Sequence, residues 1–235
     1  KMITKVSQES ELQELNSHQK DNLFRILEES DIRSLRSIPV HLYNLNFLYE
    51  KSKITFDKKL SPLLAACFMG KVEIIQVLFS NEHININLPS EGEGYTPLMV
   101  ALYKGYYEIT RFLLENDADV TMLTKSGHYP ILFCFSRLED DKYKYENRTL
   151  CMLMIELMLS KGADLNIRVD NNPGHNILMK LVSSEIETEE SLQSCLIIIK
   201  FLIERGANKK MSTLNGLGLF DTIKTEKYRE KIIDV

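Results

Sequence analysis

Cysteine and histidine are the residues of this chain best suited to metal binding or nucleophilic chemistry. The four cysteines are Cys67, Cys134, Cys151 and Cys195. A zinc site needs four ligands, or three and a water, and a thiolate nucleophile needs a base beside it. The cysteines have no such spacing, and three histidines fall in expected cap or loop segments, namely His18, His41 and His83. We expect buried free thiols in a reducing compartment, with no metal, no cofactor and no catalytic site.

The elements that would position these residues come from a pattern that recurs along the chain. One copy starts at Gly94–Leu98 and closes with Asp117–Val120, and an earlier copy starts at Ser61–Leu63. A third starts at Tyr129–Ile131, so that the copies follow one another at roughly 33 to 35 residues, a period typical of repeat proteins. The chain is therefore expected to be a row of similar units.

Each unit is expected to contain a turn and two short helices. Ser61 and Thr96 can cap a first helix, because their hydroxyls can accept hydrogen bonds from its free amides. Gly70 and Gly105 can end that helix in a left-handed conformation. Apolar stripes then predict second helices over about residues 72–80 and 107–115.

The later units depart from this pattern through two polar inserts. The third unit carries Leu138–Arg148 between its helices, and the fourth carries Ser183–Glu190. The fourth unit's second helix is expected to return at Leu196–Ile203, which places Cys151 and Cys195 at the starts of second helices. Such inserts are either tolerated surface variation or recognition elements, since loops often carry function. A last partial unit is expected to end in a charged helix over Glu226–Lys231.

The repeat resembles the ankyrin family, most specifically in the units that begin at Ser61 and Thr96. This resemblance implies an all-α fold, an ankyrin-repeat solenoid of stacked helix–turn–helix units with N- and C-terminal helical caps. Residues 1–55 are expected to form the N-terminal cap with a possible degenerate repeat, the alternative being a separate functional domain. Residues 56–235 are expected to hold the repeats 56–90, 91–123, 124–168 and 169–211, and a C-terminal partial repeat and cap, 212–235.

The family resemblance implies a protein-interaction module or adaptor that binds a protein partner through the concave face. Hairpin tips and first helices form this face, and the residues expected to contact the partner are Phe68, Met69, Glu93, Tyr95, Tyr103, Lys104, Lys125, His128, Arg137, Asn172 and His175. Phe68, Tyr95 and Tyr103 are large side chains that the repeat does not need for its core. They are either anchors for a partner or a shield that packs within the groove.

The functional alternatives concern the whole protein. The chain can be the targeting part of a longer, effector-like protein, as ankyrin modules of intracellular bacteria, protists or large viruses are. It can also be the substrate-recognition domain of an enzyme whose catalytic part lies outside this chain.

His128 and His175 each follow a glycine at a hairpin tip and align across neighbouring units. Two imidazoles alone make a poor zinc site. They are interpreted as turn residues whose rings support the hairpins, or as a pH-sensitive contact to a partner.

Composition limits the remaining function classes. The formal net charge is −4 and 44% of the residues are hydrophobic, which fits a folded protein and lacks the basic footprint of a nucleic-acid binder. No apolar run approaches the roughly 20 residues that span a bilayer. We expect a monomer in the cytoplasm, or in the host cytosol if the protein is a secreted effector.

Overall fold

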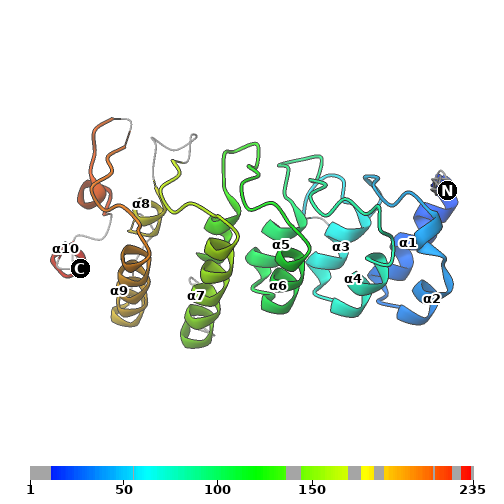
Figure 1. Cartoon of the computed structure of the whole chain (residues 1–235), viewed down its shortest axis with the longest axis horizontal. Helices are drawn as coiled ribbons and strands as arrows, with labels where there is room; N and C mark the ends of the chain where they lie inside the picture. The colour runs from blue at the N-terminus through cyan, green and yellow to red at the C-terminus, as the bar shows by residue number, and fades with distance from the viewer. Residues whose placement is uncertain are drawn as a thin grey trace, which may run out of the picture.

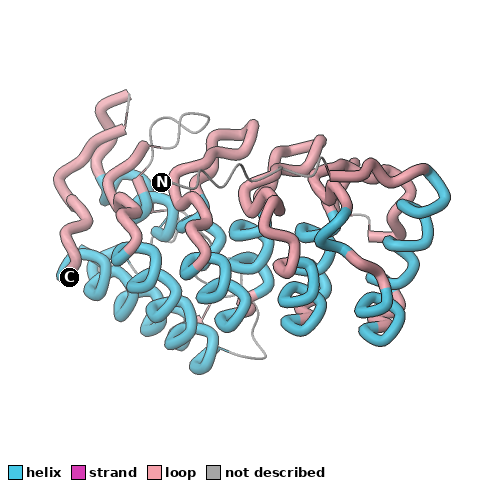
Figure 2. The backbone as a smooth tube through the Cα atoms, turned by 45° about the vertical axis from the view of Figure 1, so that its right-hand side comes forward, coloured by secondary structure: helices cyan, strands magenta, loops and turns pink. Residues whose placement is uncertain are grey.

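The protein is an elongated row of helices, with its two ends at opposite ends of the row (Figure 1). The computed structural model describes residues 12–54, 56–135, 144–168, 176–182, 188–213, 215–223 and 229–233. Loops gather along one edge of the row and helices along the other (Figure 2). Successive units pack on one another, since α3 contacts α5, α6 contacts α7 and α7 contacts α9. This arrangement confirms the expected all-α solenoid.

The N-terminal unit contains the helices α1 (Ser17–Glu28) and α2 (Ile32–Ser37) and the short 3-10 helix η1 (Val40–Leu42). Asn16 caps α1 by accepting a hydrogen bond from the Gln19 amide at 2.9 Å. One side of α1 is buried, at Leu23, Phe24, Ile26 and Leu27. The segment packs on the next unit, since α1 contacts α3. The division of the chain at residue 55 remains a prediction.

The next two units follow the predicted pattern. The first has α3 (Pro62–Met69) and α4 (Val72–Leu78), and the second has α5 (Pro97–Lys104) and α6 (Tyr107–Glu115). Their first helices bury almost every side chain between neighbours, including Leu64, Ala65 and Ala101 at 0% exposure. Small alanines allow this close approach.

The third and fourth units correct two predicted helix starts and one predicted helix type. The first helix of the third unit is a 3-10 helix, η2 (Pro130–Phe135). Its second helix, α7 (Lys144–Ser160), begins inside the predicted insert, and α9 (Glu189–Glu204) begins at the end of the other insert. Lys, Glu and Arg are good helix formers, and acidic residues suit a helix N-terminus, so polar segments that read as loops extend these helices. Cys151 and Cys195 accordingly lie inside their helices and not at the starts.

The remaining elements complete the solenoid. The fourth unit has the short first helix α8 (Ile177–Val182), and the C-terminal part has the 3-10 helix η4 (Leu219–Thr222) and α10 (Arg229–Ile233). The predicted charged helix over 226–231 overlaps α10, while its first residues, 226–228, lie outside the described part of the chain. Ile232, on α10, is 2% exposed and joins the common core.

Asparagine side chains join the loops of successive units. Asn81 is 1% exposed and donates to the carbonyl oxygens of Val40 at 2.9 Å and Tyr43 at 2.6 Å. The Asp119 amide donates to the side chain of Asn87 at 2.9 Å, and the Asn208 amide to Asn166 at 2.7 Å. Amide side chains can donate and accept at once, so they satisfy loop backbone groups that helices cannot.

Candidate partner-binding surface

Helix caps determine where the first helices start and end. The Ser61 hydroxyl accepts a hydrogen bond from the Leu64 amide at 3.1 Å, and the Thr96 hydroxyl accepts one from the Met99 amide at 3.3 Å. Gly70 ends α3 with φ 72°, a left-handed conformation that glycine adopts without steric cost. The last turns of α3 and α5, just before these endings, carry the residues expected to contact a partner.

Those last turns carry four of the expected residues, all of them at least partly exposed. Tyr103 is 43% exposed, while Phe68, Met69 and Lys104 are half-buried. Phe68 and Met69 still pack on the edge of the hydrophobic core. The structure therefore gives Tyr103 the largest free surface of this group.

Aromatic rings meet at the edge of the hairpin tips. The Phe56 ring lies between three of the expected residues, with centroid distances of 5.2 Å to Phe68, 4.7 Å to Tyr95 and 6.1 Å to Tyr103. Tyr95 in turn contacts Phe133 edge to face at 5.8 Å. These separations are those at which aromatic pairs attract one another. We call Phe56, Phe68, Tyr95, Tyr103 and Phe133 the aromatic ridge.

Sequence reasoning missed Phe56 and Phe133. Phe56 precedes the first clear repeat, and only the returning hairpin brings it to Phe68. Phe133 occupies the fourth position of η2, as Val100 does in α5, and Val100 is 0% exposed. Because a 3-10 helix turns in 3.0 residues and an α-helix in 3.6, the fourth side chain is rotated by about 60°. That rotation is consistent with the place of Phe133 beside Tyr95 on the ridge.

Lys104 adds a cation to the ridge. Its ammonium nitrogen lies 3.9 Å from the centroid of the Phe68 ring. A ring face attracts a cation at this distance, so the long side chain is held in one place. The sequence predicted Lys104 as a contact residue but not this pairing.

Carboxylates at the tips join neighbouring hairpins. Asp57 accepts hydrogen bonds from the Ser90 hydroxyl at 2.5 Å and the Glu93 amide at 2.8 Å. Glu93 accepts from the Ser126 amide at 2.7 Å and from the Ser126 hydroxyl. Each tip thus uses its acid to hold the next tip, as a carboxylate is suited to do. Glu93, expected as a partner contact, has this internal role, and its contact with a partner remains a prediction.

These hydrogen bonds lower the pKa values of Asp57 and Glu93. Burial acts to raise the pKa of Asp57, but the hydrogen bonds from Ser90, Lys58 and Glu93 outweigh it, so that the pKa lies below its usual value. Hydrogen bonds from Ser126 likewise lower the pKa of Glu93. Both tips are therefore held by ionised carboxylates at neutral pH.

Lys125 and His128 lie on the next tip. The exposed Lys125 donates through its ammonium group to the Glu91 carbonyl oxygen at 2.6 Å. His128 is half-buried, and its ring contacts Phe133 at a centroid distance of 6.5 Å. Burial, and then the charge of Lys180 on α8, lower the pKa of His128, while Glu93 acts to raise it. The backbone of His128 closes the hairpin, through the hydroxyl and amide of Thr124. Support of the hairpin by the His128 ring remains a prediction.

Three of the expected contact residues lie outside the described part of the chain. They are Arg137, Asn172 and His175. The expected alignment of His128 with His175 across neighbouring units therefore remains a prediction.

The cysteines are buried thiols. Burial raises the pKa of Cys67, Cys134 and Cys151, and raises that of Cys195 to about 12. A thiol of this kind stays protonated at neutral pH and is a poor nucleophile or metal ligand. Among the described residues, no three cysteine, histidine or acidic side chains are grouped so as to hold a metal ion. No helix of the described chain has the length and apolarity to cross a membrane.

Taken together, stacked helix–turn–helix units with hairpin tips along one edge define a class of protein, the helical-repeat solenoid (Figure 1). Residues 38–124 match the family model for ankyrin repeats, three copies. Residues 38–124 are thus ankyrin repeats, as the caps and glycines of the first units predicted. Ankyrin repeats are generally protein–protein interaction modules.

Several known proteins resemble this chain over part of their length. The rat ankyrin repeat and SAM domain-containing protein 6 is 37% identical over 68 residues, 29% of this chain and 8% of the relative. The Caenorhabditis elegans ankyrin repeat and KH domain-containing protein mask-1 is 26% identical over 204 residues, covering 70% of this chain and 8% of the relative. The rice BTB/POZ domain and ankyrin repeat-containing protein NPR3 is 25% identical over 157 residues, 67% of this chain and 25% of the relative. The chain thus spans a quarter or less of these relatives.

Proposed function

We propose that this chain binds a protein partner through the concave face formed by the hairpin tips and the first helices. The observation that carries this proposal is the aromatic ridge, in which the rings of Phe68, Tyr95 and Tyr103 meet Phe56 at the edge of the hydrophobic core. Aromatic residues are the commonest energetic anchors of protein interfaces, since they bury a large area with few rotatable bonds. A row of rings over successive units matches the surface on which repeat proteins bind extended partners.

The contact residues of this proposal are divided between two roles. Phe68, Tyr95 and Tyr103 are the anchors, with Met69 and Lys104 beside them. Polar contacts at the rim come from Glu93, Lys125 and His128, and from the expected residues Arg137, Asn172 and His175. We place the interaction in the cytosol, because four buried, unpaired thiols suit a reducing compartment. The chain acts there as a monomeric binding module.

Site-specific photocrosslinking tests this function. Tyr103 is replaced by the photoreactive p-benzoylphenylalanine, and the purified protein is irradiated in lysate of the cells that make it. The matched control carries the same residue in place of Glu108, which is exposed on α6. We expect a discrete covalent adduct with another protein from position 103 and none from position 108. Adducts formed equally from both positions, or only from position 108, would place the partner elsewhere.

A further inference from the structure

A hollow of about 550 Å³ lies between the N-terminal unit and the first full repeat. One wall comes from the segment that runs from the last turn of α2 through η1, and the other wall comes from α4. Both helices lie at the edge of the row opposite the hairpin tips (Figure 1). The volume is within the range of ligand-binding sites. The hollow is therefore a candidate site away from the aromatic ridge.

The hollow lies where α2 ends early at a proline. Helix α2 has six residues, whereas the second helix α6 has nine. Ile38 is extended, as the residue before a proline usually is, and Pro39 begins the turn into η1. Asn81 fixes this segment to the first repeat, because its side chain donates to the carbonyl oxygens of Val40 and Tyr43. The wall is thus held in place without a ligand.

The wall from α4 carries a carboxylate that has no partner in the described part of the chain. Glu73 is the second residue of α4, as Glu108 is of α6. In α6, Arg111 forms an ion pair with Glu108 at 2.8 Å. In α4, Gln76 stands at the place of that arginine and also lines the hollow. The carboxylate of Glu73 forms no ion pair or hydrogen bond with a described residue and is exposed at the hollow.

The facing wall carries a guanidinium and an imidazole. Arg36, in the last turn of α2, and His41, in η1, line the hollow. Both side chains are exposed, and neither is hydrogen-bonded or ion-paired to any residue that the structure describes. Apolar side chains line the hollow as well, at Ile38, Val40 and Val77. The hollow thus offers a positive group on one wall, a negative group on the other, and apolar surface with them.

These groups define a ligand that carries charges of both signs. Arg36 presents paired donors that suit a carboxylate, and Glu73 would bind an amine or a guanidinium. An aliphatic side chain would cover the apolar surface of Val77. Exposed ion pairs contribute only about 0.2 to 1 kcal/mol each, so a free small molecule would gain little from them. A segment of a protein makes further contacts around the hollow and suits the site better.

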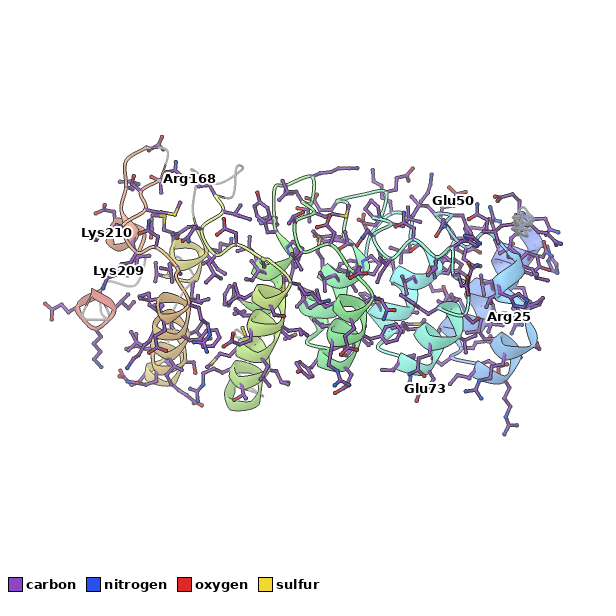
Figure 3. All side chains as sticks on the ribbon, viewed as in Figure 1. Arg25, Glu50, Glu73, Arg168, Lys209 and Lys210 are labelled. Atoms are coloured by element: carbon purple, nitrogen blue, oxygen red, sulfur yellow. The ribbon has the colours of Figure 1, made fainter. Side chains whose placement is uncertain are left out.

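We propose that the hollow between α2 and α4 binds an extended segment of a second protein, in which an acidic and a basic residue flank an aliphatic residue. Glu73 lies at the edge of the row opposite the hairpin tips (Figure 3). The chain would then hold two protein segments at once, one at the aromatic ridge and one at the hollow. The hollow adds a second surface to the proposed function and does not depend on the ridge.

A random dodecapeptide library displayed on phage provides the probe. The library is first depleted on R36Q/E73Q, and the remaining phage are selected on the unchanged 235-residue chain. Depletion removes peptides that bind the aromatic ridge or other surfaces, because the double variant keeps those surfaces and the same formal net charge. We expect the enriched peptides to carry an acidic and a basic residue on either side of an aliphatic residue.

Matched variants test whether these peptides bind in the hollow. A labelled enriched peptide is titrated by fluorescence anisotropy with R36Q/E73Q and with E108Q/R111Q, which changes the same two residue types on α6. We expect a loss of affinity of about fivefold or more in the first variant, because two ion pairs with the peptide are removed. The second variant and Tyr103→Ala should each change the affinity less than about twofold. Thermal denaturation checks that all three variants are folded.

Single variants test which charge of the peptide each wall binds. Changing the acidic residue of the peptide to Gln should weaken its binding to the unchanged chain but not to Arg36→Gln. Changing the basic residue of the peptide to Gln should likewise weaken its binding to the unchanged chain but not to Glu73→Gln. In each case the variant already lacks the charge with which that residue pairs.

Four results would overturn the proposal. They are no enrichment after depletion, enrichment of peptides with charges of one sign only, an equal loss of affinity in the two double variants, or an equal loss in Tyr103→Ala and R36Q/E73Q. Crosslinking from position 103 tests the ridge separately. Failure of the hollow and failure of the proposed function are therefore told apart.

Discussion

His128 is the residue that reports most directly on the electrostatics of the binding face. Its ring lies beside Phe133, and burial, followed by the charge of Lys180, lowers its pKa below the usual 6.5. The folded state therefore binds fewer protons than the unfolded chain as the pH falls past 6.5. The stability that neutral His128 contributes to the fold is fully present above the pKa of the unfolded state. It is lost as the pH falls through the lower pKa of the folded state.

We predict that NMR titration of His128 gives a pKa below 6.5, and that Lys180→Gln moves it upward. The reason is that this variant removes the neighbouring positive charge but leaves the burial unchanged. An unchanged His128 titration would mean that Lys180 does not face the tip.

At the scale of the elements, left-handed glycines decide where the helices end. Gly70 has φ 72°, and a side chain there would bring Cβ to 2.6 Å from the Tyr106 ring. Gly162, after α7, has φ 89° with no atom within 4 Å of such a Cβ. Substitution at Gly162 would therefore cause backbone strain alone, while substitution at Gly70 would add steric overlap with Tyr106.

We predict that Gly162→Ala lowers the free energy of unfolding by about 1 kcal/mol, the cost of the left-handed conformation. Gly70→Ala should cost clearly more, about 2 to 4 kcal/mol, because the Tyr106 ring must also move. Urea denaturation of both variants measures the difference. Equal losses of unfolding free energy in the two variants would show that the Tyr106 ring moves aside without an energetic cost.

The sequence predicted helix limits well where a residue type, such as a capping hydroxyl or a left-handed glycine, acts in only one way. Ser61, Thr96, Gly70 and Gly105 determined the limits of α3 and α5, since hydroxyl caps and left-handed endings are local properties. The start of α7 was wrong because Lys, Glu and Arg suit both a loop and a helix. The ridge was found only in part, because Phe56 reaches it through a hairpin and Phe133 through 3-10 winding. Neither effect is visible in a repeat alignment.

At the scale of the whole molecule, each unit is stabilised mainly by its neighbours. Asn81 makes one such junction, because its buried amide donates to two carbonyl groups of the N-terminal unit, those of Val40 and Tyr43. Removing it leaves two carbonyl groups without this donor at a buried place. The junction therefore joins the N-terminal unit to the repeats.

We predict that Asn81→Ala lowers the free energy of unfolding by about 1 to 3 kcal/mol. Hydrogen exchange should show the loss first in α1 and α2. The control is Asn116→Ala, since the exposed side chain of Asn116 donates to the Phe112 carbonyl oxygen of the helix that it follows. If both variants lose the same stability, the asparagine contacts between units carry no special weight.

The proposal that the ridge binds the protein partner is tested most directly by truncating one exposed side chain in the ridge and one on another helix outside it. Tyr103 on α5 and Leu153 on α7 are almost equally exposed, at 43% and 45%, so neither truncation opens a core cavity. With the partner obtained by crosslinking, isothermal titration calorimetry gives Kd for Tyr103→Ala and for Leu153→Ala. We predict a weakening of about 1 to 3 kcal/mol, roughly 5- to 150-fold, for Tyr103→Ala at an unchanged melting temperature, and less than a twofold change for Leu153→Ala. Unchanged affinity in Tyr103→Ala together with a loss in Leu153→Ala would contradict the account and assign recognition to the second helices.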